Sequence, residues 1–389
     1  MEIKVREGAP ADAEICGWIC YDAFKTISEA HGRRPDFPAP EVAIGLLKWM
    51  LAHPKFYSVI AEIDGRIIGS NFLDERNRIA GVGPITVDPT VQNHTIGRRL
   101  MDAVHQRAAE RNFAGVRLLQ AGFHARSLSL YAKLGYDVRE HLACMQGSAL
   151  GISIEGHVVR LAAEADLEAC NRVCQQVHGH DRGGELQDAI AQGSATLVEH
   201  DGRITGYATI IGFFGHAVGE TNKDVKALRG AAKEFAGPGF LLPTRNGELF
   251  RWCLSNGLRI AQPMTLMSRG LYNEPAGAFL PSILYSLSLP LITFPPYETQ
   301  QKASPLSAQS SQRFERQTIR NRSVSCAVNP IYACESCRRI FTTFSIVFQF
   351  RVVSGTPRSF SILPRLVIAF ICRRYMAIFS RMHCAESPR

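Results

Sequence analysis

The segment best suited to bind a ligand is a loop that leads into a helix, in residues 88–98. A strand-like run ends at Val87, Asp88-Pro89 turns the chain, and a helical pattern begins at Ile96. A loop that enters a helix directs several unpaired backbone N–H groups one way, at the positive end of the helix dipole. That arrangement suits a pyrophosphate, but an ordinary helix start with a few polar residues has the same pattern. The loop by itself leaves both interpretations open.

Hydrophobic periodicity and turn residues predict the elements that position this loop. Strands are predicted at residues 3–6, 57–63, 66–73, 79–87, 116–120 and 136–145, and helices at 10–31, 41–53, from 96 onward and near 125–134. Asp64-Gly65 between two strand-like runs indicates a tight hairpin. Ile96, Leu100 and Val104 mark one face of a helix at i, i+4 spacing. The predicted fold class is therefore α/β, with a mixed and mostly antiparallel sheet.

The chain also repeats itself, which is typical of a duplicated fold. Three sets of letters recur in order: Val5-Arg6, Ala11-Asp12, Glu14, Cys16 and Cys20 as Val159-Arg160, Ala165-Asp166, Glu168, Cys170 and Cys174; Asp64-Gly65-Arg66-Ile67 as Asp201-Gly202-Arg203-Ile204; and Leu134-Gly135-Tyr136 as Asn256-Gly257-Leu258. The offset shrinks from 154 to 137 to 122 positions, so the second copy is a shortened version of the first. We expect a first domain at 1–146, a linker at 147–156 and a second domain at 157–285.

The net charge of +9 belongs to the end of the chain. Residues 286–389 contain 14 Lys and Arg and 4 Asp and Glu. Residues 1–285 therefore contain 30 Lys and Arg and 31 Asp and Glu, which gives them a net charge of −1. We expect this Ser- and Arg-rich tail to lack a stable fold, and a nucleic-acid partner would depend on the tail alone. The uncharged stretch 275–297 contains five prolines and three serines, which argue against a membrane span. We therefore expect neither a nucleic-acid nor a membrane partner.

Cysteine and histidine spacing favours packing over metal binding. Cys16 and Cys20, like Cys170 and Cys174, lie four apart inside helical patterns without further ligands at metal-site spacing. The group His178, His180 and Asp181 is interpreted as a polar loop between helices, and Cys334-x2-Cys337 as half of a zinc knuckle. The chain begins without an apolar signal-peptide core, so a cytoplasmic location with reduced thiols is expected.

Three motifs in order resemble the GNAT N-acetyltransferase superfamily. They are Gly83-Pro84-Ile85-Thr86-Val87-Asp88-Pro89, similar to the central strand; Gln92-Asn93-His94-Thr95-Ile96-Gly97, similar to the Gln/Arg-x-x-Gly-x-Gly/Ala cofactor loop; and the run from Arg126 to Tyr136, similar to the closing helix and the strand that follows it. The second copy resembles the second half of tandem-domain members, at residues 242–249 and 270–275. The resemblance covers about residues 1–285 and implies two tandem GNAT-like domains, with a catalytic first domain and a degenerate second one.

The resemblance implies acetyl-CoA as the acyl donor, without a metal. The cofactor-binding residues it implies are Ile85, Thr86, Val87, Gln92, Asn93, His94, Thr95, Ile96, Gly97, Arg98 and Ser127. It also implies an oxyanion donor among the N–H groups near Thr86–Val87 and Tyr131 as the general acid. The sequence departs from the family at Thr95, which replaces a glycine. Thr95 either keeps an ordinary conformation and offers its hydroxyl to phosphate, or weakens cofactor binding.

The predicted function is acetyl transfer from acetyl-CoA directly to a small-molecule or protein amine. The alternative is a non-catalytic acyl-CoA sensor or scaffold of the same fold, which is suggested by Thr95 and by the lack of an evident base. Glu62, Asp74 and Glu75 lie in or beside the hairpin strands and are interpreted as surface charges. The second copy lacks the cofactor loop and is expected to form one wall of the acceptor groove. No motif in the sequence identifies the acceptor or the oligomeric state.

Overall fold

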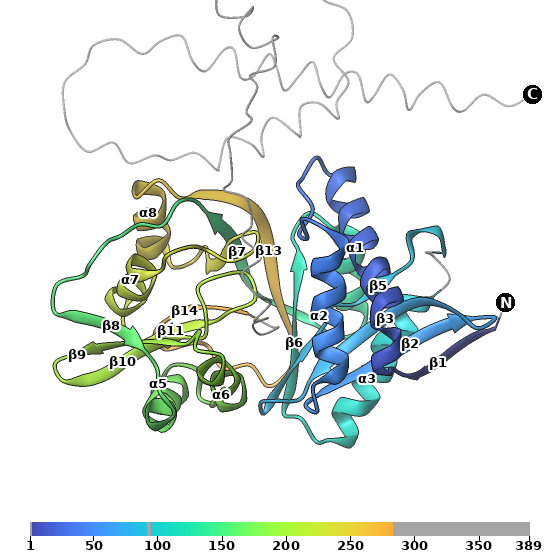
Figure 1. Ribbon diagram of the computed structural model, residues 1–389, viewed down its shortest axis with the longest axis horizontal. Coiled ribbons are helices and arrows are strands. Elements are labelled where there is room, and N and C mark those ends of the chain that lie inside the picture. Colours follow the sequence, from blue (N-terminus) through green and yellow to red (C-terminus); the bar gives the residue numbers. More distant parts are fainter. Residues whose placement is uncertain (1, 92–94, 283–389) are drawn as a thin grey trace, which may run out of the picture. The chain divides into compact units, whose positions relative to one another are not determined.

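The elements of the protein follow the predicted order. A computed structural model describes residues 2–91 and 95–282 (Figure 1). The first repeat contains strands β1 (Ile3–Glu7), β2 (Phe56–Ile63), β3 (Arg66–Asp74), β4 (Ile79–Val82), β5 (Thr86–Val87), β6 (Gly115–Ala121) and β7 (Asp137–Gln146), with helices α1 (Ala13–Ala30), α2 (Pro40–Ala52), α3 (Ile96–Glu110) and α4 (Ala125–Lys133). Every element predicted for this repeat is present, but the strand predicted over 79–87 is divided into β4 and β5.

The second repeat has the same succession of elements in a shorter form. Its strands are β8 (His157–Leu161), β9 (Thr196–His200), β10 (Arg203–Ala208), β11 (Ala217–Gly219), β12 (Phe240–Pro243), β13 (Arg259–Gly270) and β14 (Ala278–Leu280), and its helices are α5 (Leu167–His178), α6 (Gly183–Ala191), α7 (Asn222–Ala231) and α8 (Gly247–Ser255). Residues 147–156, between the repeats, contain neither helix nor strand.

Matching ion pairs in the two repeats support the duplication. Arg6 of the first repeat pairs with Asp12 and Glu62, at 2.8 and 2.7 Å. Arg160 of the second pairs with Asp166 and Glu199, at 2.7 and 2.8 Å. In both cases the aspartate follows the arginine by six positions and accepts a backbone N–H at the start of a helical turn. The letters that recur in the sequence therefore occupy equivalent positions in the fold.

The strands form two sheets, of which the larger is mixed and the smaller is antiparallel. A nine-stranded sheet has the order β1-β2-β3-β4-β6-β13-β7-β12, with β5 beside β3, and a five-stranded sheet has the order β14-β11-β10-β9-β8. Among the described residues, β4 and β6 are the pair that runs parallel, and the other neighbours are antiparallel. The mixed, mostly antiparallel α/β fold predicted from the sequence is confirmed.

The larger sheet takes strands from both repeats. Strand β13 of the second repeat lies between β6 and β7 of the first, and pairs Leu266 with Leu119 on one side and with Glu140 on the other. Strand β7 in turn has β12 of the second repeat on its outer edge. The two repeats therefore share backbone hydrogen bonds as well as side-chain contacts, and the linker 147–156 does not separate two independent sheets (Figure 1).

Helices cover both faces of the first repeat's strands. Helices α1 and α2 pack Cys16, Cys20 and Leu47 against Phe72 of β3. Helix α3 packs against the opposite face, which carries the neighbouring residue Leu73. The cysteines of the equivalent helix α5 are also buried. All four cysteines that lie four apart in the sequence therefore pack in apolar cores. Alternate side chains of a strand point to opposite faces, so β3 separates two cores.

The predictions for the end of the chain lie outside the described residues. These are the unfolded basic tail 286–389, its Cys334-x2-Cys337 pair and most of the uncharged stretch 275–297. Within residues 2–91 and 95–282, no helix combines the length and the apolar character needed to cross a membrane.

Candidate functional site

The site predicted from the sequence contains an opening between two strands. Strand β4 pairs in parallel with β6 as far as Gly81 and Arg117. The chain then breaks its strand at residues 83–85 and resumes as β5, which pairs with Gly69 and Ser70 of β3. No described residue of β5 pairs with β6 beyond that point. We call this place, where the pairing with β6 has ended, the opening.

The direction of one backbone N–H in this opening follows from strand alternation. The Asp88 N–H donates to Ile68 O of β3 at 2.9 Å. Successive N–H groups of a strand point to opposite edges, so the Val87 N–H points toward β6. Thr86 is 4% exposed, and Ile85 and Val87 are partly buried against the core. Of the three residues predicted as cofactor contacts here, Thr86 and Val87 form β5 and Ile85 lies in the break before it.

The turn into α3 has the conformation that a glycine would favour. Thr95 caps the helix with φ 61° and ψ 5°, which is left-handed. Of the two alternatives for Thr95, the one in which it keeps an ordinary conformation is therefore wrong. A left-handed conformation brings Cβ of an L-residue close to the following carbonyl oxygen, at a cost of about 1–2 kcal/mol. Thr95 is thus left-handed despite its side chain, and the helix that follows presents its first N–H groups.

The helix start lies beside α4. A Cβ placed on Gly97 would be 3.6 Å from Cδ2 of Leu130, the residue before Tyr131. Ile96 is buried in the core, and Arg98 is exposed. The remaining predicted loop contacts, Gln92, Asn93 and His94, lie outside the described residues.

Replacement of Thr95 by glycine tests the strain at this turn. We expect Thr95→Gly to raise the free energy of unfolding by about 1 kcal/mol, because glycine adopts a positive φ at little cost. Acetyl-CoA should also bind more tightly, since the loop no longer resists the bound conformation. Urea denaturation and calorimetric titration would measure the two effects. Thr95→Ala is the control, and weaker acetyl-CoA binding by both variants would instead indicate a hydroxyl–phosphate contact.

Tyr131 is held in the core beside this loop. Its side chain is 7% exposed, and its ring lies 6.1 Å from that of Tyr136 in an edge-on arrangement. The Tyr131 hydroxyl donates to no described residue, and burial raises the pKa of this phenol. The phenol therefore keeps its proton at neutral pH and has that proton available for a ligand. Ser127, the other predicted residue of α4, donates to Gln120 Oε1 at 3.0 Å and to His124 O at 2.9 Å.

Sequence reasoning missed a carboxylate near the far end of β6. Asp36 lies between α1 and α2, and its Oδ1 accepts a hydrogen bond from Gln262 Nε2 of β13 at 3.0 Å. The same loop contacts the turn that follows β6, because the Arg33 guanidinium lies 5.1 Å from the Phe123 ring. Burial raises the pKa of Asp36 to about 6, and the Gln262 hydrogen bond opposes that rise. No local motif identifies Asp36, since Gln262 is 226 positions away.

Two of the three carboxylates expected on the surface are buried instead. Asp74 is 2% exposed and pairs with Arg76 at 2.6 Å. The Glu75 side chain is 6% exposed and pairs with Arg107 at 2.6 Å. Both are engaged in ion pairs, so neither is available to take a proton from an acceptor. The interpretation of Asp74 and Glu75 as surface charges is wrong because their arginine partners hold them inside the fold.

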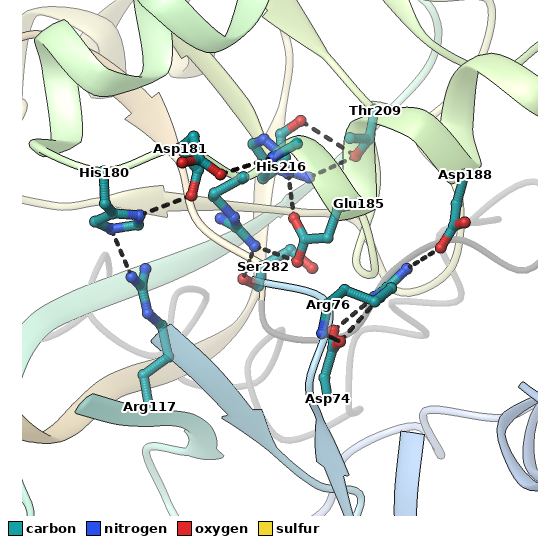
Figure 2. Close-up of polar contacts among 12 residues, drawn as sticks. Asp74, Arg76, Arg117, His180, Asp181, Glu185, Asp188, Thr209, His216 and Ser282 are labelled. Carbon is teal, nitrogen blue, oxygen red and sulfur yellow. Dashed lines mark hydrogen bonds and ion pairs between the residues drawn. The ribbon is translucent and has the colours of Figure 1, made fainter. Parts of the chain in front are cut away.

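The polar loop of the second repeat faces the first repeat. His178 is 6% exposed and stacks on His180, and the His180 ring contacts Arg117 of β6 (Figure 2). The loop does join α5 to α6, as predicted, but it lies against β6. Within the described part of the chain, no group of three or more His, Cys, Asp or Glu side chains could hold a metal ion.

Comparisons with known proteins agree with this geometry. The pattern of the acetyltransferase (GNAT) family matches residues 12–136. A putative acetyltransferase from Pyrococcus horikoshii is 16% identical, with a TM-score of 0.56 over 72% of this chain and 94% of its own. A GCN5-related N-acetyltransferase from Sphaerobacter thermophilus is also 16% identical, with a TM-score of 0.47 over 70% of this chain and 96% of its own. No curated protein matches significantly. The Pyrococcus likeness covers more than one repeat and shows that the fold extends over both.

Proposed function

We propose that this chain, whose residues 12–136 match the acetyltransferase (GNAT) family, transfers an acetyl group from acetyl-CoA directly to an amine. The observation that carries the proposal is the opening between β5 and β6 beside the start of α3. Bound acetyl-CoA would supply the thioester and the pyrophosphate. The N–H groups that begin α3 suit the pyrophosphate, and the opening suits the extended arm that bears the thioester.

Three groups of this chain have the chemistry that acyl transfer requires. The backbone of β5 at Thr86–Val87 lies where the pairing between β4 and β6 has ended, and it is the place for the oxyanion donor that acyl transfer requires. The Tyr131 hydroxyl, protonated at neutral pH, can donate a proton to the departing thiolate. Asp36, with a pKa of about 6, is ionised at pH 7–8 and can accept the proton of the attacking amine. We therefore assign Asp36 as the base that the sequence did not reveal.

The position of Gly97 allows a direct test of cofactor binding. A side chain fits there, because the nearest atom to an added Cβ is Leu130 Cδ2 at 3.6 Å, an ordinary contact. We expect Gly97→Asp to weaken acetyl-CoA binding about tenfold or more, because a carboxylate at the helix start repels phosphate. The same charge is favourable at a helix N-terminus, so the variant should stay folded. Calorimetric titration would measure the affinity, with Gly97→Ala as the matched control.

A turnover assay separates the enzyme from the non-catalytic alternative. CoA release would be followed with a panel of primary amines in the presence of acetyl-CoA. Amine-dependent release supports an acetyltransferase, whereas tight acetyl-CoA binding without release favours a sensor or scaffold. Equal acetyl-CoA affinity in wild type and Gly97→Asp would remove the start of α3 from the proposed site.

A further inference from the structure

Strand β8 of the second repeat leaves one edge of its sheet open. It comes last in the five-stranded sheet, with β9 on one side and no described strand on the other. Just beyond β8, the Ala162 N–H donates to Ala195 O at 2.9 Å, toward β9. Backbone groups alternate along a strand, so those of His157, Val159 and Leu161 point away from β9, to the open edge. A strand edge of this kind is a template for pairing with another strand.

Two of the backbone groups on this edge already have partners within the chain. The His157 N–H donates to Ile154 O at 3.0 Å, and the Leu161 carbonyl accepts from Nη1 of Arg160 at 3.1 Å. No described residue bonds to the other four groups, which are the Val159 N–H and carbonyl, the Leu161 N–H and the His157 carbonyl. These four groups are the ones that a second strand can bind.

The four groups are complementary to the same four groups of a second copy. With a two-fold axis beside Val159, antiparallel pairing places Val159 opposite Val159 of the second copy, and Leu161 opposite its His157. The two Val159 residues then exchange both of their hydrogen bonds, and each Leu161 N–H donates to the His157 carbonyl across the axis. The groups that this pairing leaves over are the His157 N–H and the Leu161 carbonyl, which already have partners. The edge of β8 therefore matches itself.

The side chains of β8 are apolar at positions where an unpaired edge strand usually carries charges. Val158 and Leu161 are 62% and 64% exposed. The letters that recur in the sequence place Lys4 and Glu7 of β1 at the equivalent positions, and both are exposed there. Charged side chains on an edge strand hinder its pairing with another chain. The duplication thus provides an internal comparison, in which the side chains protect β1 and do not protect β8.

The backbone of β1 is protected as well. Strand β1 also comes last in its sheet, and Nη1 of Arg99 donates to its Ile3 carbonyl at 2.9 Å. This carbonyl is equivalent to that of His157, which accepts from no described residue. Arg99 therefore covers in the first repeat the acceptor that the second repeat leaves available.

We propose that two copies of this chain associate through β8, antiparallel about a two-fold axis beside Val159. The two five-stranded sheets become one continuous sheet across the axis. Val158 of each copy lies opposite Arg160 of the other and packs on the apolar stem of that side chain. The association is independent of the proposed acetyl transfer, because β8 contains no residue of the candidate site.

The mass of the full chain in solution tests the association. Sedimentation equilibrium over a range of concentrations should show a species of twice the chain mass of 43.0 kDa. Val158→Lys should raise the dissociation constant about tenfold or more, because each lysine then lies opposite Arg160 of the other copy. Val138→Lys is the matched control, since Val138 is 43% exposed on β7, away from β8. The far-UV circular dichroism spectrum of both variants should equal that of wild type.

Leu161→Pro removes a donor between the copies without removing one from the pairing with β9. The Leu161 N–H points to the open edge, and proline is tolerated in a strand at such a position. The dimer loses two of its four hydrogen bonds between the copies, so we expect the dissociation constant to rise again by about tenfold or more. A normal circular dichroism spectrum would show that the variant is folded.

Cysteine cross-linking tests the position of the axis. In a hydrogen-bonded antiparallel pair the Cα atoms are about 5.5 Å apart, a separation that a disulfide can span. Val159→Cys should therefore form a covalent dimer under mild oxidation, whereas Val158→Cys, which lies opposite Arg160, should not. Wild type gives the background, and its cysteines in the described part of the chain are buried.

Three results would overturn the proposal. The first is a wild-type chain that keeps the mass of one copy at every concentration. The second is a dimer that Val158→Lys and Leu161→Pro leave as stable as in wild type, because the copies then associate through another surface. The third is a failure of Val159→Cys to cross-link above the wild-type background, or a stronger cross-link of Val158→Cys, because the axis then does not lie beside Val159.

Discussion

Asp36→Asn is expected to lower kcat/KM at pH 8 by about 100-fold or more, which is the usual contribution of a general base. The amide keeps an oxygen that can accept from Gln262 Nε2, so the loop between α1 and α2 should hold its position. What is lost is the ability to take a proton. Steady-state kinetics against a saturating amine would measure the effect, and Asp22→Asn, at an exposed position of α1, provides the matched control.

The pH dependence gives Asp36 a distinctive signature. In wild type, kcat/KM should fall as the pH drops through about 6, because protonation removes the base. Asp36→Asn should lack this acid limb. The folded-state pKa is raised above the ordinary value of 3.8, so ionisation of Asp36 costs stability as the pH rises through about 6. The variant should thus be at least as stable as wild type at pH 8. A less stable variant that keeps the acid limb would assign Asp36 a structural role instead.

Tyr131→Phe is expected to lower kcat by about 100-fold, because the departing thiolate loses its proton donor. The substitution removes one oxygen that bonds to no described residue, so the core around Tyr136 should stay packed. Acetyl-CoA affinity should change little. Stopped-flow turnover and calorimetric titration would separate the two effects, with Tyr21→Phe on α1 as the control.

The pH profile again gives an independent readout for Tyr131. Burial raises its pKa, so the wild-type rate should show no alkaline limb from this phenol below pH 10. An unchanged kcat in Tyr131→Phe would remove this residue from the mechanism. A large loss of acetyl-CoA affinity with normal kcat would make it a binding residue.

Local patterns in the sequence predicted the elements and their order. The hairpin at Asp64-Gly65 and the equivalent one at Asp201-Gly202 both adopt positive φ, as the turn residues indicate. The periodic apolar face of α3 is buried, with Leu100 and Val104 fully enclosed. These features can be predicted because turn chemistry and helix periodicity depend on residues that are close in the sequence.

Several features of the site depend on contacts far apart in the sequence. The left-handed turn at Thr95 could not be read from threonine, because the fold imposes it against the residue's own preference. Asp36 acquires its raised pKa only when the folded chain buries it, against the opposing effect of the Gln262 hydrogen bond. Asp74 and Glu75 look like surface charges until their arginine partners are placed beside them. Burial and counter-charge are properties of the folded surroundings and not of the residue itself.

The sequence alone determined that this protein has two related α/β repeats, and it predicted in the first of them a loop suited to acyl-CoA. Only the tertiary structure decided that β13 of the second repeat lies between β6 and β7 of the first, and that Arg117 faces His180 across the repeats. The physical reason is that strand edges present the same backbone donors and acceptors whatever their side chains. A strand's neighbour is therefore chosen by packing of the whole core, and the charges brought together at the site follow from that choice.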